Sequence, residues 1–524
     1  MEFFEHPLIK AQSIEKRAYQ ERLINSVLRK GSTLVVAPTA LGKTIIAAVL
    51  AAHFLGKGKN VLMVAPTKPL AMQHQKTLKK VLNIPKSEIV LITGAKAPKQ
   101  RYLLYKEARV ISATPQCIEN DIKQKLIDLS KIGLCIFDEA HRAVGNYSYV
   151  FIAKKFKEQG SSLLLGLTAS PGHEKERIAE ICNNLGIKNI EIVTLEDEDV
   201  KPYISEIKLE WRKVELPEEF KQIKKALTDF IRENASKLKE LSVTKMPRQD
   251  YFNRAKLLAL QRKISSMIEK RGRERPELYT LAARVASLIK ANHALILIET
   301  QGPKALWAYF QRLYEKDRNT KAGKMFLNNA SVARAALITK KLVESNAKHP
   351  KLIMLAKIIQ EQLGENPNSR IIVFNHYRDS VELLEKELNE LENVKAKRFI
   401  GQAKRESKGM SQKEQAKAIK EFESNKINVL IATSVGEEGL DIPACDLVIF
   451  YEAVPSEIRH IQRRGRTARV KSGRVIILLT KGTRDEAYYW VARRKERKML
   501  EQLKDMKGQN KIAKQQTLSS YLGE

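Results

Sequence analysis

The chain has 524 residues, which is too long for one compact core, so we expect two or three domains. An apolar fraction of 43% is ample for packed cores and excludes a disordered chain. The 94 Lys and Arg residues outnumber the 60 Asp and Glu residues, which gives a formal net charge of +34. Such a surplus favours a polyanionic partner, above all nucleic acid, although a basic soluble protein without such a partner is the alternative.

Other features of the sequence exclude further classes of protein. No stretch approaches the roughly 18 apolar residues of a membrane span, so we expect no membrane partner. The N-terminus has two acids among its first six residues and no apolar signal segment, so we expect a cytoplasmic protein associated with the nucleoid. The four cysteines lie far apart without a C-x-x-C pair, which excludes a zinc knuckle, an iron–sulfur cluster and a disulfide framework.

Residues 1–204 alternate short apolar runs with spacers of helical periodicity. The apolar runs are strand candidates at 34–37, 61–65, 89–92, 109–112, 134–137 and 163–167. This alternation predicts a doubly wound parallel sheet with helices on both faces. The same alternation returns in residues 348–490, which we expect to form a second α/β domain. Its strand candidates are 371–374, 394–399, 429–432, 447–450 and 475–479.

The intervening residues 205–347 show long helical periods without a clear strand between them. Residues 205–348 hold 31 Lys and Arg against 16 Asp and Glu, a net charge of +15. We therefore expect an all-helical basic insert that recognises nucleic-acid structure. The remaining residues, 491–524, are expected to form a basic helical tail with a disordered end.

Residues 37–44, with the sequence APTALGKT, predict a phosphate-binding loop because they follow a strand candidate and open a helix. Backbone N–H groups and the helix N-terminus would bind the phosphate oxygens. Lys43 would reach the β- and γ-phosphates, and the Thr44 hydroxyl would hold Mg²⁺. The strict pattern has glycine in place of Ala37, so an ordinary strand-to-helix turn is the alternative.

Two adjacent acids, Asp138 and Glu139, directly follow the strand candidate at 134–137. Carboxylates at the carboxyl end of a parallel strand face the crevice where ligands bind. We expect Asp138 to bind Mg²⁺ and Glu139 to orient or activate the attacking water.

Residues 462–469, with the sequence QRRGRTAR, gather positive charge around one glycine in the second α/β region. An anion between these side chains would relieve their repulsion, and a γ-phosphate in transfer is such an anion. A solvated basic turn, or a contact with a nucleic-acid backbone, is the alternative.

Together these segments resemble the motifs of superfamily 2 helicases in order and spacing. The segments are Tyr19–Gln20, 37–44, Thr67–Pro69, Thr114–Pro115, Asp138–His141, Thr168–Ser170, Val373–Asn375, Thr433–Pro443 and 462–469. The basic insert resembles that of the archaeal Hef helicases and the Fanconi anaemia M-type translocases. RIG-I-like and Dicer helicases also carry an insert there. The resemblance implies two RecA-like motor domains that bind ATP and Mg²⁺ between them.

The resemblance also implies roles for single residues. Arg17 and Gln20 would read the adenine, with Thr39, Ala40, Leu41 and Gly42 in the loop, and Gly439 and Asp441 would approach the ribose. Gln462 would lie near the γ-phosphate, and Arg466 and Arg469 would act as arginine fingers. Nucleic-acid contacts would come from Thr67, Lys68, Thr114, Asn375 and Thr433. The basic run at 270–275, with Arg271 and Arg273, is the candidate contact for a duplex arm.

These roles imply an ATP-dependent helicase or translocase on forked, branched or single-stranded DNA in replication-fork repair, with 3′-to-5′ movement. A double-stranded-RNA translocase of RIG-I or Dicer type and a passive structure-specific DNA-binding protein are the alternatives. Residues 515–522 resemble a peptide that docks on a sliding clamp, with a disordered terminus as the alternative. Hef proteins continue into an XPF-type nuclease domain, so the resemblance implies that such a domain is missing from this chain.

Overall fold

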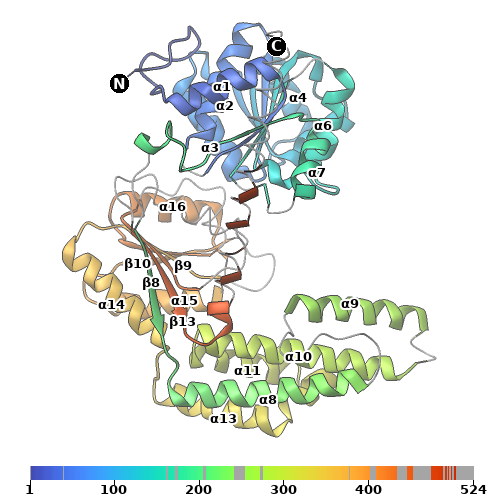
Figure 1. Cartoon of the computed structure of the whole chain (residues 1–524), viewed down its shortest axis with the longest axis vertical. Coiled ribbons are helices and arrows are strands. Elements are labelled where there is room, and N and C mark those ends of the chain that lie inside the picture. Colours follow the sequence, from blue (N-terminus) through green and yellow to red (C-terminus); the bar gives the residue numbers. More distant parts are fainter. Residues whose placement is uncertain are drawn as a thin grey trace, which may run out of the picture.

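The computed structural model of the chain contains two parallel sheets and a helical bundle (Figure 1). The residues that it describes are 2–38, 41–160, 163–169, 171–172, 175–203, 208–240, 254–271, 275–376, 378–401, 409–433, 445–452, 474–487 and single positions between 490 and 505.

The first α/β domain is built on a seven-stranded parallel sheet of order β3-β4-β2-β5-β6-β1-β7. Its strands are β1 (Thr33–Val36), β2 (Asn60–Val64), β3 (Ile89–Ile92), β4 (Val110–Ala113), β5 (Ile132–Asp138), β6 (Leu163–Thr168) and β7 (Asn189–Ile192). Its helices are α1 (Ala18–Lys30), α2 (Lys43–Gly56), α3 (Lys68–Val81), α4 (Pro98–Glu107), α5 (Pro115–Lys123), α6 (Ser148–Gln159) and α7 (Lys175–Leu185). All six strand candidates of this region are confirmed. The edge strand β7 escaped prediction because only its last residue is buried.

Two hydrophobic cores lie on the opposite faces of this sheet. Leu34 and Leu62 pack with residues of α5, α6 and α7, whereas Val35 and Val61 pack with residues of α1, α2 and α3. Neighbouring side chains of one strand thus point to opposite faces, as the period of two requires. The helices cover both faces, which confirms the doubly wound fold.

The second α/β domain has a six-stranded parallel sheet of order β10-β11-β9-β12-β13-β8. Its strands are β8 (Lys208–Val214), β9 (Ile371–Phe374), β10 (Ala396–Phe399), β11 (Val429–Ala432), β12 (Leu447–Phe450) and β13 (Arg474–Thr480). Its helices are α14 (Pro350–Glu365), α15 (Arg378–Asn389) and α16 (Gln412–Glu423). The five predicted strands are confirmed. The sixth strand, β8, corrects the predicted start of the helical insert.

Strand β8 lies within residues 205–347, which were predicted to be all helical. It pairs with β13 over its whole length, from Lys208 opposite Arg474 to Val214 opposite Thr480. As an edge strand it buries only Val214 fully, so its sequence lacks the apolar run that marks a central strand. The helical insert therefore begins after β8, and the chain enters the second sheet before it forms the insert.

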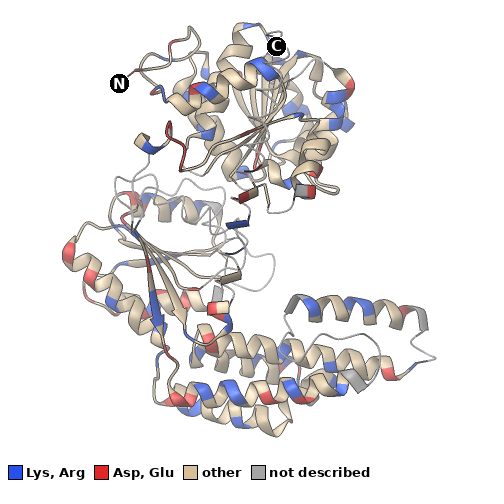
Figure 2. Cartoon of the chain, in the orientation of Figure 1, with Lys and Arg blue, Asp and Glu red and all other residues tan. Residues whose placement is uncertain are grey.

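The insert is a helical bundle, which Figure 1 shows beside the second sheet, and its described residues form six helices. They are α8 (Glu218–Glu240), α9 (Arg254–Arg271), α10 (Glu277–Thr300), α11 (Pro303–Lys316), α12 (Lys321–Leu327) and α13 (Ala330–Glu344). Lys and Arg residues gather along α8 and α9 (Figure 2).

Helix α10 corrects the expectation that no stretch approaches a membrane span. Among the described residues, it is the one helix that is long and apolar enough to cross a membrane by length and composition. Within its apolar window, 61% is buried inside the protein, where α10 contacts α8, α9, α11 and α12. It is therefore the core helix of the bundle.

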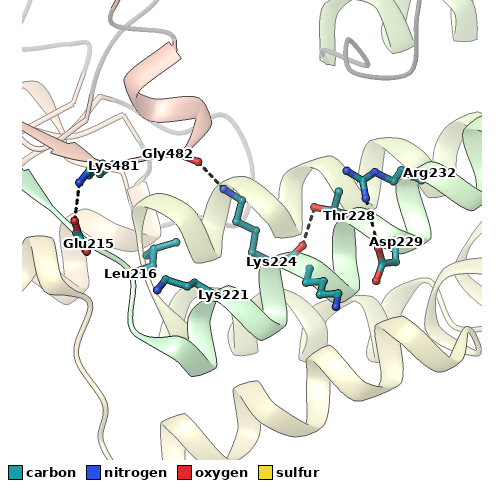
Figure 3. A pocket seen from close by; sticks show the side chains of 10 residues that line it. Glu215, Leu216, Lys221, Lys224, Thr228, Asp229, Arg232, Lys481 and Gly482 are labelled. Atoms are coloured by element: carbon teal, nitrogen blue, oxygen red, sulfur yellow. Dashed lines mark hydrogen bonds and ion pairs between the residues drawn. The ribbon is translucent and has the colours of Figure 1, made fainter.

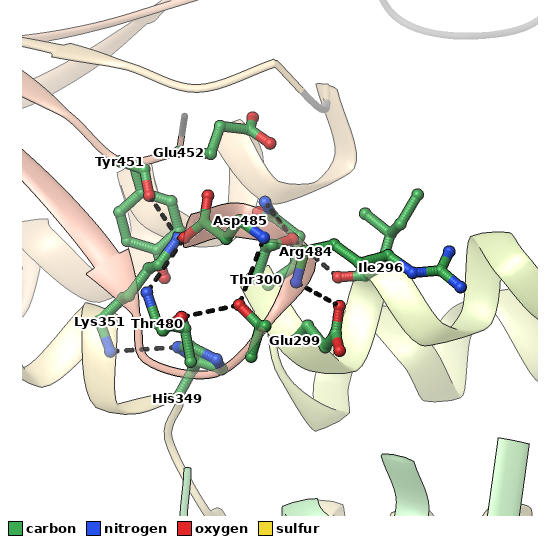
Figure 4. A network of polar contacts seen from close by, with 12 residues as sticks. Ile296, Glu299, Thr300, His349, Lys351, Tyr451, Glu452, Thr480, Arg484 and Asp485 are labelled. Atoms are coloured by element: carbon green, nitrogen blue, oxygen red, sulfur yellow. Dashed lines mark hydrogen bonds and ion pairs between the residues drawn. The ribbon is translucent and has the colours of Figure 1, made fainter. Parts of the chain in front are cut away.

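A buried polar network of the second domain reaches this bundle through Arg484 and Glu299 (Figure 4). Lys351 is fully buried, forms an ion pair with Asp485 and donates to the Tyr451 carbonyl at 2.9 Å. The backbone N–H of Arg484 donates to the buried Glu299 of α10 at 3.4 Å. Removing one partner of such a buried pair leaves an uncompensated charge, at a cost of about 3–5 kcal/mol. The bundle and the second sheet are thus firmly joined.

Candidate active site

The loop before α2 is held by two buried side chains of α1. The Tyr19 hydroxyl donates to the Leu41 carbonyl at 3.0 Å, and Gln20 Nε2 donates to the same carbonyl at 3.2 Å. Gly42 has a φ of +67°, and a Cβ atom there would lie 2.6 Å from Gln20 Nε2. Only glycine fits both constraints, so this part of the motif is required by the shape of the loop.

Lys43 and Thr44 are the first two residues of α2, where N–H groups point out of the helix. Lys43 Nζ donates to the carbonyls of Ala37 at 2.9 Å and Pro38 at 3.3 Å, so the ammonium group lies over the loop. A helix N-terminus with an ammonium group beside it suits phosphate. Two predicted loop residues, Thr39 and Ala40, lie outside the described residues.

Asp138 is the last residue of the central strand β5. It lies at the carboxyl end of the parallel strands, where the loop after β1 also begins. It is 7% exposed, and its Oδ2 lies 2.8 Å from Nε2 of His74 on α3. Burial raises the pKa of Asp138, but the neighbouring His74 and Lys43 lower it more, and the resulting pKa lies below the usual value. The carboxylate is therefore ionised at neutral pH and faces the same site as Lys43.

Glu139 has a left-handed backbone, with φ +52°, which is uncommon for a residue other than glycine. The Tyr149 hydroxyl supports this turn because it donates to the Asp138 carbonyl at 2.6 Å. His141 Nδ1 lies 3.3 Å from Glu139 Oε2 and 3.1 Å from the Thr168 hydroxyl. The predicted water-orienting acid thus lies beside a histidine that contacts the end of β6.

Arg17 and Gln20 lie beside the loop, as a contact with the base of ATP requires. Arg17 pairs with Glu15 at 3.1 Å, and its guanidinium lies 5.2 Å from the centre of the Tyr203 ring. Gln20 is 2% exposed, and its Oε1 has no hydrogen-bond partner in the part of the chain that the structure describes. A buried acceptor of this kind suits the amino group of adenine.

The residues predicted to hold Mg²⁺ fit a hard cation in their chemistry. Asp138 offers an ionised carboxylate and Thr44 a hydroxyl in the first turn of α2, and Mg²⁺ prefers such oxygen ligands. Among the described residues, no group of three or more His, Cys, Asp and Glu side chains forms another metal site.

The predicted nucleic-acid contacts divide into two groups. Thr67, Lys68 and Thr114 are half-buried where α3 and α5 begin, directly after β2 and β4. In contrast, Asn375 is fully buried and its amide donates to Gln301 of the insert at 3.3 Å.

This contact places Asn375 at the joint between the insert and the second sheet, and its role as a nucleic-acid contact stays a prediction. Thr433 is 4% exposed, and its role likewise stays a prediction. Arg271 is the last residue of α9, and its side chain is outside the description. Six more predicted site residues lie outside the described residues: Arg273, Gly439, Asp441, Gln462, Arg466 and Arg469.

Comparison with known proteins identifies the family. Residues 17–178 match "DEAD/DEAH box helicase", residues 351–471 match "Helicase conserved C-terminal domain", and residues 219–349 match "Putative ATP-dependent RNA helicase, helical bundle". The crystal structure of the Hef helicase domain from Pyrococcus furiosus is 44% identical in sequence, with a TM-score of 0.71. That match covers 92% of this chain and 99% of the other. The chain belongs to the Hef-type superfamily 2 helicases.

Curated relatives of this helicase carry both DNA and RNA in their names. A Methanocaldococcus jannaschii protein named "Putative ATP-dependent RNA helicase" is 43% identical, over 96% of this chain and 63% of its own length. "ATP-dependent DNA helicase mph1" of Neurospora crassa is 33% identical, over 90% and 41%. "DEAD-box ATP-dependent RNA helicase FANCM" of Arabidopsis thaliana is 33% identical, over 91% and 36%. The chain therefore spans less than two thirds of the length of each.

Two side chains of this helicase site were not predicted from the sequence. His74 and Tyr149 belong to none of the segments from which the site was predicted. Their partner Asp138 lies 64 residues from His74 and 11 from Tyr149. A contact between residues that follow neighbouring strands leaves no local sequence pattern. Only the fold therefore reveals the contacts of His74 and Tyr149 with Asp138.

Proposed function

We propose that this helicase is an ATP-dependent motor that moves 3′-to-5′ on DNA and acts on forked or branched substrates in replication-fork repair inside the cell. The observation that carries the proposal is that Lys43, at the start of α2, and the ionised Asp138 face the same site at the carboxyl end of the first sheet. That pair is suited to a nucleoside triphosphate with its metal ion.

Each residue of the site has a chemical role in this proposal. The loop and Lys43 bind the phosphates, Gln20 accepts from the adenine amino group through Oε1, and Glu139 orients a water molecule. Thr44 and Asp138 would hold Mg²⁺, which neutralises phosphate charge when bound. Asp441 would approach the ribose, and Gln462, Arg466 and Arg469 would complete the site from the second domain.

DNA as substrate is supported by a basic groove of about 510 Å³ along α8 (Figure 3). Basic side chains line it: Lys221, Lys224, Lys225, Arg232 and Lys481. Glu215 and Asp229 also line the groove, and Glu218 and Glu299 pair with Lys221 and Lys224. The exposed basic groups suit the phosphate backbone of a duplex arm, whose position they would fix without reading its sequence.

Charge removal from this groove should weaken fork binding. The variant Lys221→Ala, Lys225→Ala, Arg232→Ala removes three exposed charges from one side of α8. We expect the slope of log affinity against log salt for a forked DNA to fall by up to about 2.7, since each lost contact removes about 0.9.

The matched control Arg334→Ala, Lys340→Ala, Lys341→Ala removes three exposed charges from α13. It should leave that slope near the wild-type value. Equal losses in both variants would mean that net charge, and not the groove, provides the affinity.

Steady-state ATPase with single-stranded DNA, forked DNA and double-stranded RNA compared side by side tests the proposal. We expect forked and single-stranded DNA to stimulate turnover most. Greater stimulation by double-stranded RNA would favour the RNA translocase, to which the names of two relatives point. Nucleotide binding without turnover would favour a passive DNA-binding protein.

Two partners remain proposals. Residues 515–522, the candidate sliding-clamp peptide, lie outside the described residues. The curated relatives are longer than this chain, and a nuclease domain in a longer protein is likewise a proposal.

A further inference from the structure

Helix α3 connects a predicted nucleic-acid contact to the nucleotide site. It begins at Lys68, and the Thr67 hydroxyl caps it by accepting from the Leu70 N–H at 3.4 Å. His74 lies on the same helix, 4% exposed, with Nε2 at 2.8 Å from Asp138 Oδ2. His74 lies six positions after Lys68 in the helix, which corresponds to a rise of about 9 Å along its axis.

The polar contact of His74 is directed at Asp138. An ionised carboxylate only accepts hydrogen bonds, so Nε2 of His74 carries the hydrogen in this pair. The other ring nitrogen, Nδ1, is buried and has no hydrogen-bond partner among the described residues. Buried polar atoms are normally paired, so the unpaired Nδ1 leaves the contact with Asp138 as the polar contact that orients this ring among the described residues.

Other contacts tie α3 to the sheet beside it. Gln75 Nε2 donates to the Ile89 carbonyl of β3 at 2.9 Å, and the Ser112 hydroxyl of β4 donates to the Ala71 carbonyl at 2.7 Å. Lys68 and His74 belong to one continuous helix, so a displacement at its start would reach His74.

We propose that His74 is a positioning residue that orients the Asp138 carboxylate for the metal ion and couples nucleic-acid contact at Thr67 and Lys68 to the nucleotide site. The inference rests on the proposed function. The contact of His74 with Oδ2 would fix the orientation in which the Asp138 carboxylate meets the metal ion. Partners of this kind typically change metal affinity about 10- to 100-fold when removed.

The first test measures Mg²⁺-dependent binding of a fluorescent ATP analogue to the full chain without DNA. His74→Ala should raise the Mg²⁺ concentration for half-maximal binding at least about tenfold. His74→Gln keeps an N–H donor and should recover most of the affinity. Gln75→Ala is the matched control because it loosens the same helix without touching Asp138, and it should leave the Mg²⁺ requirement unchanged.

The second test compares the stimulation of ATPase by single-stranded DNA at saturating Mg²⁺. His74→Ala should lose most of the stimulation, whereas His74→Gln, which keeps the N–H donor to Asp138, should retain it. If His74→Ala does not fold, as judged by thermal unfolding, His74→Leu fills the same space without a donor and takes its place.

The outcomes separate the inference from the proposed function. Wild-type protein without Mg²⁺-dependent nucleotide binding would overturn both. Normal wild-type binding with an unchanged Mg²⁺ requirement in His74→Ala would overturn the positioning role alone. A raised Mg²⁺ requirement with wild-type DNA stimulation would overturn the coupling.

Discussion

Lys43→Ala is expected to abolish measurable ATP turnover, a loss of at least about a thousandfold, while DNA binding changes little. Lys43 Nζ lies over the loop at the N-terminus of α2, where it would contact the phosphates. DNA affinity comes from many dispersed basic contacts, so the loss of the Lys43 charge at the nucleotide site should leave that affinity unchanged. Steady-state ATPase and DNA-binding titrations measure the two effects.

Asp138→Asn should have the same result because it removes the ionised carboxylate that would hold the metal. Lys57→Ala, an exposed lysine at the other end of α2, is the matched control and should retain wild-type turnover. Near-normal turnover in Lys43→Ala or Asp138→Asn would overturn the assignment of the nucleotide site.

The second large effect is expected at Arg466 and Arg469. Replacement of either by alanine should lower kcat by about 10³- to 10⁵-fold if they stabilise the γ-phosphate during transfer. ATP affinity should stay near the wild-type value, since the phosphate loop and the adenine contacts belong to the first domain. Single-turnover hydrolysis and equilibrium nucleotide binding distinguish the two quantities.

Lys471→Ala, two residues beyond Arg469, is the control for a loss of positive charge in this segment. It should leave kcat within about threefold of wild type, because it lies outside the motif. A loss below tenfold in both arginine variants would assign the arginines to DNA binding or to structure.

Local pattern was sufficient to predict most of the fold and the phosphate loop. The central strands are buried on both faces, so their apolar runs stand out, and the glycine of the loop is required by a positive φ. Edge strands lack that signal: β7 and β8 face solvent over much of their length and were missed. The apolar composition of α10 was overlooked, and its role as a core helix depends on the helices around it.

Contacts between distant segments could not be predicted from the sequence. Asn375 was expected to contact nucleic acid because of its motif, and the fold also brings it to Gln301 of the insert, where it is buried. His74 reaches Asp138 only because α3 begins directly after β2, which pairs with β5. Neither fact follows from composition or spacing, since both depend on the order of strands in the sheet.

Displacement of a labelled strand from forked DNA is the most direct test of a DNA motor. We predict displacement with ATP from a fork whose single-stranded arm permits 3′-to-5′ entry, and none with a non-hydrolysable analogue or with Lys43→Ala. Displacement that proceeds equally well with the analogue or with Lys43→Ala would contradict the account, because strand separation would then need binding alone.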